Sequence, residues 1–400
     1  MSSKLFKLII ISFSMFVLTS GALLEVYYLR RINKSMKKLV HNSKRPEAED
    51  FSNVYNFIPK ELSNIPFGEK TGLILGSKKI DIKEHKHAYN PSIVKNKEGG
   101  YILFYRDDQL SVDKPKNSLV PFDTYIYGVK LDENFDQASK PFNLTSSCSR
   151  TAEDPRAFQK GDDTYIVFND LLPSPVYSRG MHIAKFDEET MSLESRQKLN
   201  FNIQHIEKNW TPMSSETQDD SVEFIYKMVP HISIEANIKN NTVSMENMPV
   251  NPVLIEKLWP KKFGPPRGGS PAISLNDDEY IAFFQSHFVD KQKGKTWYVM
   301  GAYTFEKSAP HKITSISKKP IIFEDMYDTP IANTACGDKR VIYPSGVVFG
   351  NLYGEDVYYV TCGENDCGIK LVTISKQKLL QNLRKVKVSE DITAQPVEMI

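Results

Sequence analysis

The segment Ala152-Glu153-Asp154-Pro155-Arg156 places two carboxyl groups and a guanidinium within five consecutive residues. A carboxyl group can exchange a proton with a polar substrate, while an arginine beside it can bind an anion. The same residues also suit a turn capped by Asp154, with a surface ion pair between Glu153 and Arg156. We therefore regard Asp154 as the candidate catalytic residue and keep the structural turn as the alternative.

A second segment, Lys208-Asn209-Trp210-Thr211-Pro212, suits recognition of a sugar. The indole offers a flat apolar face to the sugar ring, and the neighbouring amide and ammonium groups can bind its hydroxyls. The alternative is a core tryptophan beside a solvated lysine.

A third segment suits the binding of an anion and has the sequence Pro266-Arg267-Gly268-Gly269-Ser270-Pro271. Its two glycines would let the backbone approach a ligand closely. Arg267 could then bind a phosphate or carboxylate of that ligand.

Two isolated basic residues end aromatic strands, namely Arg106 in Phe104-Tyr105-Arg106 and His287 in Gln285-Ser286-His287. A period of two places Gln285 and His287 on one face of a strand. His85 and His87 form another such pair, but a metal bound by these two histidines is the less favoured alternative. We therefore expect no metal site.

These residues recur at equivalent places in an internal repeat of roughly 60 residues. Each of five segments combines a polar residue and a proline with a short apolar stretch, a turn and an aromatic-rich strand: Asn90-Pro91 to Tyr101–Tyr105, Asp154-Pro155 to Tyr165–Phe168, Thr211-Pro212 to Val222–Tyr226, Ser270-Pro271 to Tyr280–Phe284, and Tyr343-Pro344 to Val357–Val360. A third strand often follows, and only residues 375–385 are typical of a helix. The repeat predicts an all-β fold, a five-bladed β-propeller.

The strand that begins at each proline would be the innermost strand of its blade, because its first N–H need not pair. The polar residues around the prolines would then converge on one mouth of the central channel. This predicted inner ring, which we interpret as a pocket, contains Asn90, Asp154, Arg156, Thr211, Ser270 and Tyr343.

The N-terminus differs in composition from the rest of the chain. Lys4 and Lys7 precede an uncharged run over residues 8–24, close to the shortest length that spans a bilayer. We expect residues 1–29 to be an uncleaved signal-anchor, with a cleaved signal peptide and a secreted protein as the alternative. We expect residues 30–70 to form a polar stalk and residues 71–400 to form the catalytic propeller.

The overall composition excludes several classes of protein. With 400 residues, 40% of them hydrophobic, the chain is neither largely disordered nor a polytopic membrane protein. The 51 basic and 49 acidic residues give a net charge of +2, too small to indicate a nucleic-acid partner. The four cysteines lack a CxxC pair, so they indicate either one or two disulfides or free thiols rather than zinc.

In order along the chain, the motifs HxYNPS, FYR, EDPR, KNWTP, RGGSPA and YPSG…YYVTCGENDC resemble two related families. They are similar to the mannoside phosphorylases and hydrolases of glycoside hydrolase family 130. They resemble more closely the β-1,2-mannosyltransferases and phosphorylases of glycosyltransferase family 108. The resemblance covers residues 85–375, and the family fold is a five-bladed β-propeller.

The resemblance implies an inverting reaction on β-mannosides, with Asp154 as the general acid acting through a sugar hydroxyl. If the nucleophile is already an anion, no second carboxylate is needed to activate it, and the reaction requires only this one acid. It implies sugar contacts from Asn90, Arg106, Trp210, Tyr343 and Asp366, and phosphate contacts from Arg156, Lys208, Arg267 and His287. Gln285 stands where relatives often carry a histidine, which weakens the expectation of phosphate more than that of mannose.

We therefore expect a membrane-anchored enzyme that transfers or phosphorolyses β-mannosyl groups on a mannose-containing glycan. No cofactor is expected; phosphate, a sugar phosphate or a nucleotide sugar would be a co-substrate. An exported β-mannoside hydrolase is one alternative. A propeller that binds glycans without catalysis is the other, because a fold by itself does not decide function.

Overall fold

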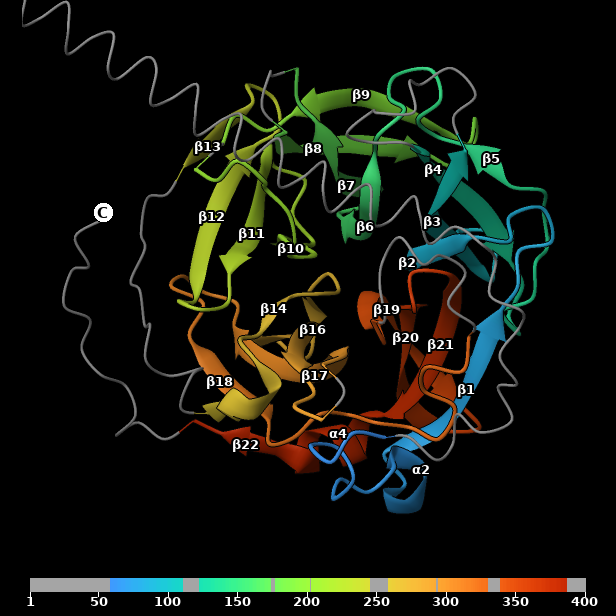
Figure 1. The fold of residues 1–400 in the computed structure, drawn as a ribbon. Coiled ribbons are helices and arrows are strands. Elements are labelled where there is room, and N and C mark those ends of the chain that lie inside the picture. Colours follow the sequence, from blue (N-terminus) through green and yellow to red (C-terminus); the bar gives the residue numbers. More distant parts are fainter. Residues whose placement is uncertain are drawn as a thin grey trace, which may run out of the picture. The chain divides into compact units, whose positions relative to one another are not determined.

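A computed structural model describes residues 58–110, 122–173, 177–201, 203–244, 258–292, 294–329 and 339–386. Five antiparallel sheets follow one another along the chain, and Figure 1 shows them around a common centre. The predicted five-bladed propeller is thereby confirmed.

The first three blades are four-stranded sheets in chain order. Their strands are β2 (Ala88–Lys95), β3 (Tyr101–Leu110), β4 (Phe122–Leu131) and β5 (Phe142–Asn143); β6 (Glu153–Lys160), β7 (Asp163–Leu171), β8 (Arg179–Asp187) and β9 (Ser192–Lys198); and β10 (Thr211–Pro212), β11 (Ser221–Lys227), β12 (Ile232–Asn237) and β13 (Thr242–Ser244).

The last two blades are completed by strands from both ends of the described chain. Blade four contains β14 (Arg267–Gly268), β15 (Ile273–Ser274), β16 (Glu279–Val289), β17 (Thr296–Glu306), β18 (Ile313–Ser317) and β22 (Leu383–Lys385). Blade five contains β19 (Ile342–Leu352), β20 (Glu355–Glu364), β21 (Gly368–Ser375) and, outermost, β1 (Ile74–Ile80). Because β1 pairs antiparallel with β21, residues far apart in sequence close the ring.

Helices are short, as the sequence predicts. The helix expected over residues 375–385 is α4 (Lys376–Asn382), whose first turn is capped by the Ser375 side chain, and the chain then continues as β22. The other helices among the described residues are α2 (Gly68–Thr71) and the 3₁₀ turn η2 (Lys261–Phe263).

Aromatic side chains fill the spaces between neighbouring blades. Phe104 of blade one meets Phe186 of blade two edge-to-face with ring centroids 4.9 Å apart. Phe283 of blade four meets Tyr358 of blade five in the same way at 6.1 Å. These aromatic contacts between blades lie on the second and third strands, while the innermost strands add smaller apolar side chains such as Val94 and Ala157 to the same clusters.

The first strands of blades one and two share an irregularity beside their prolines. The pairing register shifts between Tyr89 and Ser92 and again between Glu153 and Arg156. Within these bulges Asn90 has φ 47° and Asp154 has φ 56°. Left-handed backbone is costly for residues other than glycine and is least costly for Asn and Asp, so two equivalent strained positions indicate a functional constraint.

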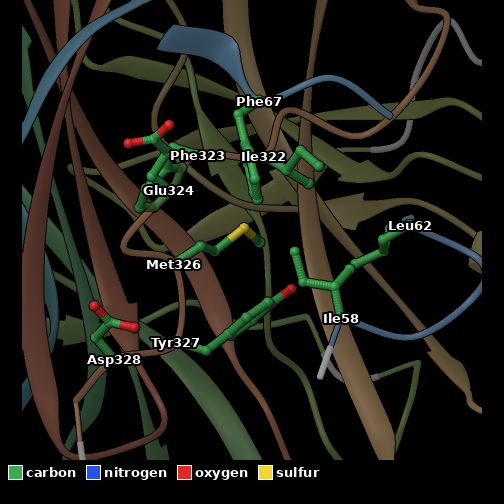
Figure 2. A pocket seen from close by; sticks show the side chains of 9 residues that line it. All are labelled: Ile58, Leu62, Phe67, Ile322, Phe323, Glu324, Met326, Tyr327 and Asp328. Atoms are coloured by element: carbon green, nitrogen blue, oxygen red, sulfur yellow. The ribbon is translucent and has the colours of Figure 1, made fainter. Parts of the chain in front are cut away.

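The folded part begins before the expected boundary at residue 71. Leu62 is only 1% exposed, and the backbone N–H of Gly68 donates to the carbonyl of Ile322 at 2.8 Å. Figure 2 shows Leu62 and Phe67 facing Met326 across a cavity of about 90 Å³. At least residues 58–70 therefore belong to the propeller and not to a stalk, because their apolar side chains are buried against blade four.

The expected anchor over residues 1–29 lies outside the described residues. Within the described ranges, no helix has the length and apolar character needed to cross a bilayer.

Candidate active site

Asp154 lies at the centre of a polar cluster formed by blades one and two. The amide of Asn90 donates to Asp154 Oδ1 at 2.8 Å, and Nη1 of Arg106 donates to the same oxygen at 3.2 Å. The carboxylate side chain retains 14% exposure, so a substrate atom can reach it. The two bulges described above allow this hydrogen bond, because they turn Asn90 and Asp154 toward each other.

Arg106 joins Asp154 to two further carboxylates. Its Nη2 donates to Asp108 at 3.0 Å and to Glu153 at 3.4 Å, and its guanidinium lies 4.6 Å from the ring centre of Tyr89. The Arg106 guanidinium therefore interacts with three carboxylates that lie on two blades. Such an arrangement fixes the direction of the Asp154 carboxylate, because Arg106 is held from several sides.

The two adjacent carboxyl groups have opposite pKa shifts. Burial raises the pKa of Asp154, but Arg106, the Asn90 hydrogen bond, Arg156 and Lys208 together hold it below its ordinary value. Burial raises the pKa of Glu153 above its ordinary value despite two nearby arginines. Asp154 therefore holds its negative charge more readily than Glu153 does, and its carboxylate is the form that accepts a proton.

Arg156 joins three blades rather than lining an open pocket. It is 1% exposed; its Nε donates to the Gly269 carbonyl at 2.5 Å, and its Nη2 donates to the hydroxyl of Tyr343. The Tyr343 hydroxyl in turn donates to Asn209 Oδ1 at 2.8 Å. These bonds occupy much of the guanidinium, so contact between Arg156 and phosphate stays a prediction.

The two glycines of the Arg267-Gly268-Gly269 turn are required by packing between blades, not by a ligand as expected. A Cβ on Gly268 would lie 2.0 Å from the carbonyl oxygen of Asn209. A Cβ on Gly269 would lie 2.4 Å from the carbonyl oxygen of Phe283 in its own blade and 2.7 Å from that of Pro344 in blade five. The close approach is thus made by neighbouring backbone.

The expectation that Trp210 stacks on a sugar is wrong. Trp210 is fully buried, its indole N–H donates to Glu207 at 3.2 Å, and its ring packs against Phe201, Phe224 and Tyr226. No face of the indole is left for a ligand. Lys208 is exposed, so the alternative of a core tryptophan beside a solvated lysine is the correct one.

Blade four contributes a basic corner to the same end of the propeller. Arg267 is exposed, and His287 stacks on Tyr298 with ring centroids 4.9 Å apart. Burial, with Arg267 and Lys339 nearby, lowers the pKa of His287, so the imidazole is neutral at pH 7. We call Arg267, His287 and Lys339 the basic corner.

Tyr298 connects the basic corner to Asp154. Its side chain acts electrostatically on Tyr343, and so does Asp154. The side-chain oxygen of Gln285, on the same strand as His287, is buried without a hydrogen-bond partner.

Asp366 lies on the blade-five side of the cluster. It acts electrostatically on Tyr89, whose hydroxyl donates to Asp108 at 2.7 Å. Asn365 beside it donates to the Tyr327 and Thr329 carbonyls at 3.0 and 2.7 Å. The Glu364-Asn365-Asp366 turn is thereby fixed, with Asp366 toward blade one.

Two members of the predicted inner ring do not line a pocket. Ser270 is fully buried and accepts the N–H of Phe283 at 3.0 Å, which stabilises its own blade. Thr211 is also fully buried. Sequence reasoning missed Arg179, whose Nη1 lies 3.3 Å from Glu153, and Lys339, because neither belongs to the proline repeat.

Other candidate chemistry is limited in the described part of the chain. It holds no group of three or more His, Cys, Asp or Glu side chains placed to bind a metal ion. Cys148 is an exposed free thiol and Cys362 a buried one, and Cys336 lies outside the described residues. His85 donates to or accepts from the Tyr105 hydroxyl at 2.8 Å.

Comparison with known proteins finds a relative in sequence. No family model matches the sequence. Over 287 residues the chain is 24% identical to β-mannosyltransferase 3 of Komagataella phaffii; the match covers 66% of this chain and 45% of that protein, so the chain spans less than half of its relative's length.

Similarity to solved structures concerns the fold. The β-1,2-mannobiose phosphorylase of Listeria innocua superposes with a TM-score of 0.51 at 13% identity, covering 78% of this chain and 97% of that one. MPT-1, a GDP-Man-dependent mannosyltransferase of Leishmania mexicana, has a TM-score of 0.49 at 12% identity, covering 77% and 91%. In agreement with the resemblance predicted from the motifs, the chain is similar in sequence to a β-mannosyltransferase and in fold to a β-mannoside phosphorylase.

Proposed function

We propose that the protein is a β-mannosyltransferase that passes mannose from an activated donor to a hydroxyl of a mannose-containing acceptor. The observation that carries this proposal is the ionised carboxylate of Asp154, held by Asn90 and Arg106 at the propeller mouth. Transfer to an acceptor requires a base that removes the hydroxyl proton, whereas phosphorolysis requires an acid that supplies one. In the transfer direction the Asp154 carboxylate is that base.

In the proposed step, the acceptor oxygen attacks the anomeric carbon of the donor from the face opposite the leaving group. The new C–O bond forms as the bond to the donor phosphate breaks, and the phosphate leaves with the electron pair. The acceptor proton passes to Asp154, directly or through a sugar hydroxyl. Configuration inverts, and one carboxylate suffices because the leaving phosphate needs no proton. In the reverse reaction Asp154 is the acid.

The basic corner is the proposed place for the leaving phosphate. Arg267 and Lys339 supply positive charge, and neutral His287 can donate one hydrogen bond. This end of the site belongs to blade four, across the mouth from Asp154 on blade two. A phosphate, a sugar phosphate or the diphosphate of a nucleotide sugar presents the same oxygens, so all three suit it.

Asn90→Asp tests the electrostatic part of this proposal. The new carboxylate would face Asp154 Oδ1 across a 2.8 Å contact, and the repulsion would raise the pKa of Asp154. We expect the acid limb of the pH profile of kcat to move to higher pH, with a larger loss at pH 5 than at pH 8. Asn134→Asp, the same change on an exposed turn, should leave the profile in place. An unshifted acid limb in Asn90→Asp would contradict a role for Asp154 in proton transfer.

Arg267→Gln tests the basic corner. Loss of one phosphate contact is expected to raise the donor KM about tenfold while kcat for bound donor changes less. Inorganic phosphate should also inhibit the variant more weakly. Lys319→Gln, an exposed change on blade four, is the control. An unchanged donor KM in Arg267→Gln would place the anion elsewhere.

The alternatives make different predictions. A hydrolase would release free mannose from β-mannosides without an acceptor, and a glycan-binding propeller would give no turnover with any donor. The N-terminal anchor over residues 1–29 is part of this proposal, because tethering suits an enzyme that extends a membrane-bound or exported glycan. Detergent-dependent extraction of the full chain, compared with a chain lacking residues 1–29, tests the tether.

A further inference from the structure

A groove lies where the segment after β7 meets the segment after β9, between blades two and three. The groove has a volume of about 390 Å³ and is lined by Leu172, Pro173, Ser178, Lys198, Ile203, Gln204 and His205. This volume lies within the range of about 300–1,000 Å³ that is usual for small-molecule sites. None of these residues belongs to the motifs that identify the site.

The groove is connected to the catalytic cluster through Arg179. Its Nη1 lies 3.3 Å from Glu153, the neighbour of Asp154, and its backbone N–H donates to the carbonyl of His205 at 2.9 Å. The Tyr177 hydroxyl lies 3.5 Å from the same guanidinium, and Tyr177 directly precedes the lining residue Ser178. A chain of sugars leaving Asp154 in this direction would pass Tyr177 before it reached the groove.

The wall formed by residues 203–207 is fixed in place. The buried carboxylate of Glu207 accepts hydrogen bonds from the backbone of Gln204 at 2.7 Å, the hydroxyl of Tyr226 at 3.3 Å and the indole of Trp210 at 3.2 Å. Trp210 does not line the groove, but its indole N–H helps to hold the Glu207 carboxylate that fixes this wall. A wall ordered in advance lowers the entropy lost when a ligand binds.

The chemistry of the groove suits a carbohydrate. Ile203 is 54% exposed and Tyr177 is 37% exposed, so both can offer apolar surfaces to the C–H faces of sugar rings. Hydroxyl, amide, imidazole and ammonium groups line the same groove and can bind sugar hydroxyls. The basic corner lies on blade four, so the groove is not the place of the donor phosphate.

We propose that this groove binds the outer sugars of an acceptor oligomannoside, with Tyr177 and Ile203 as the apolar contacts. The proposal rests on the proposed transferase function, in which the acceptor's reacting hydroxyl lies at Asp154. It assigns to the groove the units further along the acceptor, so that the enzyme binds long acceptors more tightly than short ones.

The test measures dissociation constants of β-1,2-linked mannobiose, mannotriose and mannotetraose by calorimetry, on the full chain carrying Asp154→Asn. We expect affinity to rise with chain length. Adding Tyr177→Ala or Ile203→Ser should weaken binding of the tetraose about tenfold and leave the biose unchanged. Tyr177→Phe should behave as the parent does, because the ring is retained.

Two controls change similar side chains far from the groove. They are Tyr353→Ala, at a fully exposed turn, and Leu380→Ser, on α4. Both should bind all three sugars as the parent does. Affinity that does not depend on length, or equal weakening of biose and tetraose in Tyr177→Ala and Ile203→Ser, would overturn the groove assignment.

Turnover by the chain with Asp154 intact separates this inference from the proposed function. Transfer without length-dependent binding would support the proposed transferase function and refute the assignment of the groove as an acceptor site. Length-dependent binding that Tyr177→Ala abolishes, without turnover from any donor, would keep the groove as a glycan site and refute the transferase.

Discussion

Asp154→Asn is expected to lower kcat for mannosyl transfer by about 10³-fold, within the range of about 10²–10⁴ that general acid–base groups contribute. Asparagine cannot accept the acceptor proton, yet it keeps the shape of aspartate and tolerates the left-handed backbone at φ 56°. Steady-state rates with a saturating donor and acceptor measure the effect. The binding of glycan should be nearly unchanged.

Asp108→Asn provides the matched control for that variant. Asp108 accepts a hydrogen bond from the same Arg106, at 3.0 Å, so the control also removes one negative charge from this arginine. We expect a loss of about tenfold at most, because the positioning of Arg106, Tyr89 and Thr124 is affected while the proton acceptor Asp154 is retained. Equal losses in the two variants would mean that Asp154 acts through charge balance and not through proton transfer.

Arg156→Lys is expected to destabilise the propeller by about 3 kcal/mol, because lysine cannot reproduce the forked contacts to Gly269, Tyr343 and Asn209. The carbonyl and hydroxyl left without donors are buried, which makes their loss costly. Urea unfolding followed by fluorescence measures the change in the free energy of unfolding. Most of the loss should persist in the presence of phosphate.

Arg267→Lys is the control for stability, since Arg267 is exposed and lies in the same turn as Gly269. Its free energy of unfolding should change by less than about 0.5 kcal/mol, as is usual for surface substitutions. If the Arg156→Lys and Arg267→Lys variants were equally stable, Arg156 would not be the link between blades that its contacts indicate.

The blades could be predicted because their signals are local. Each innermost strand begins with a polar residue and a proline, and a turn and an aromatic strand follow within about a dozen residues. The same repeat placed Asn90 and Asp154 at equivalent positions, and their contact follows from that equivalence. The completion of blade five by β1 could not be predicted from the repeat, because the partner strand β21 lies near the other end of the chain.

The surroundings of Trp210, which was misassigned, and of Arg156, whose contact with phosphate stays a prediction, depend on neighbours distant in sequence. Trp210 next to Lys208 is compatible with either a sugar platform or a core residue, and the choice is made by Phe224 and Tyr226 from the next strand. Arg156 next to Asp154 suggested an exposed anion ligand, whereas Tyr343 and Gly269 from two other blades bury it. Local sequence carries no information about such partners.

The most direct test of the account supplies the full chain with an α-configured donor, mannose 1-phosphate or GDP-mannose, and with β-1,2-mannobiose as acceptor. The account predicts a trisaccharide whose new linkage is β, formed by the parent and by Asp108→Asn and lost in Asp154→Asn. Release of free mannose without an acceptor, or no product from either donor while glycan binding is intact, would contradict it.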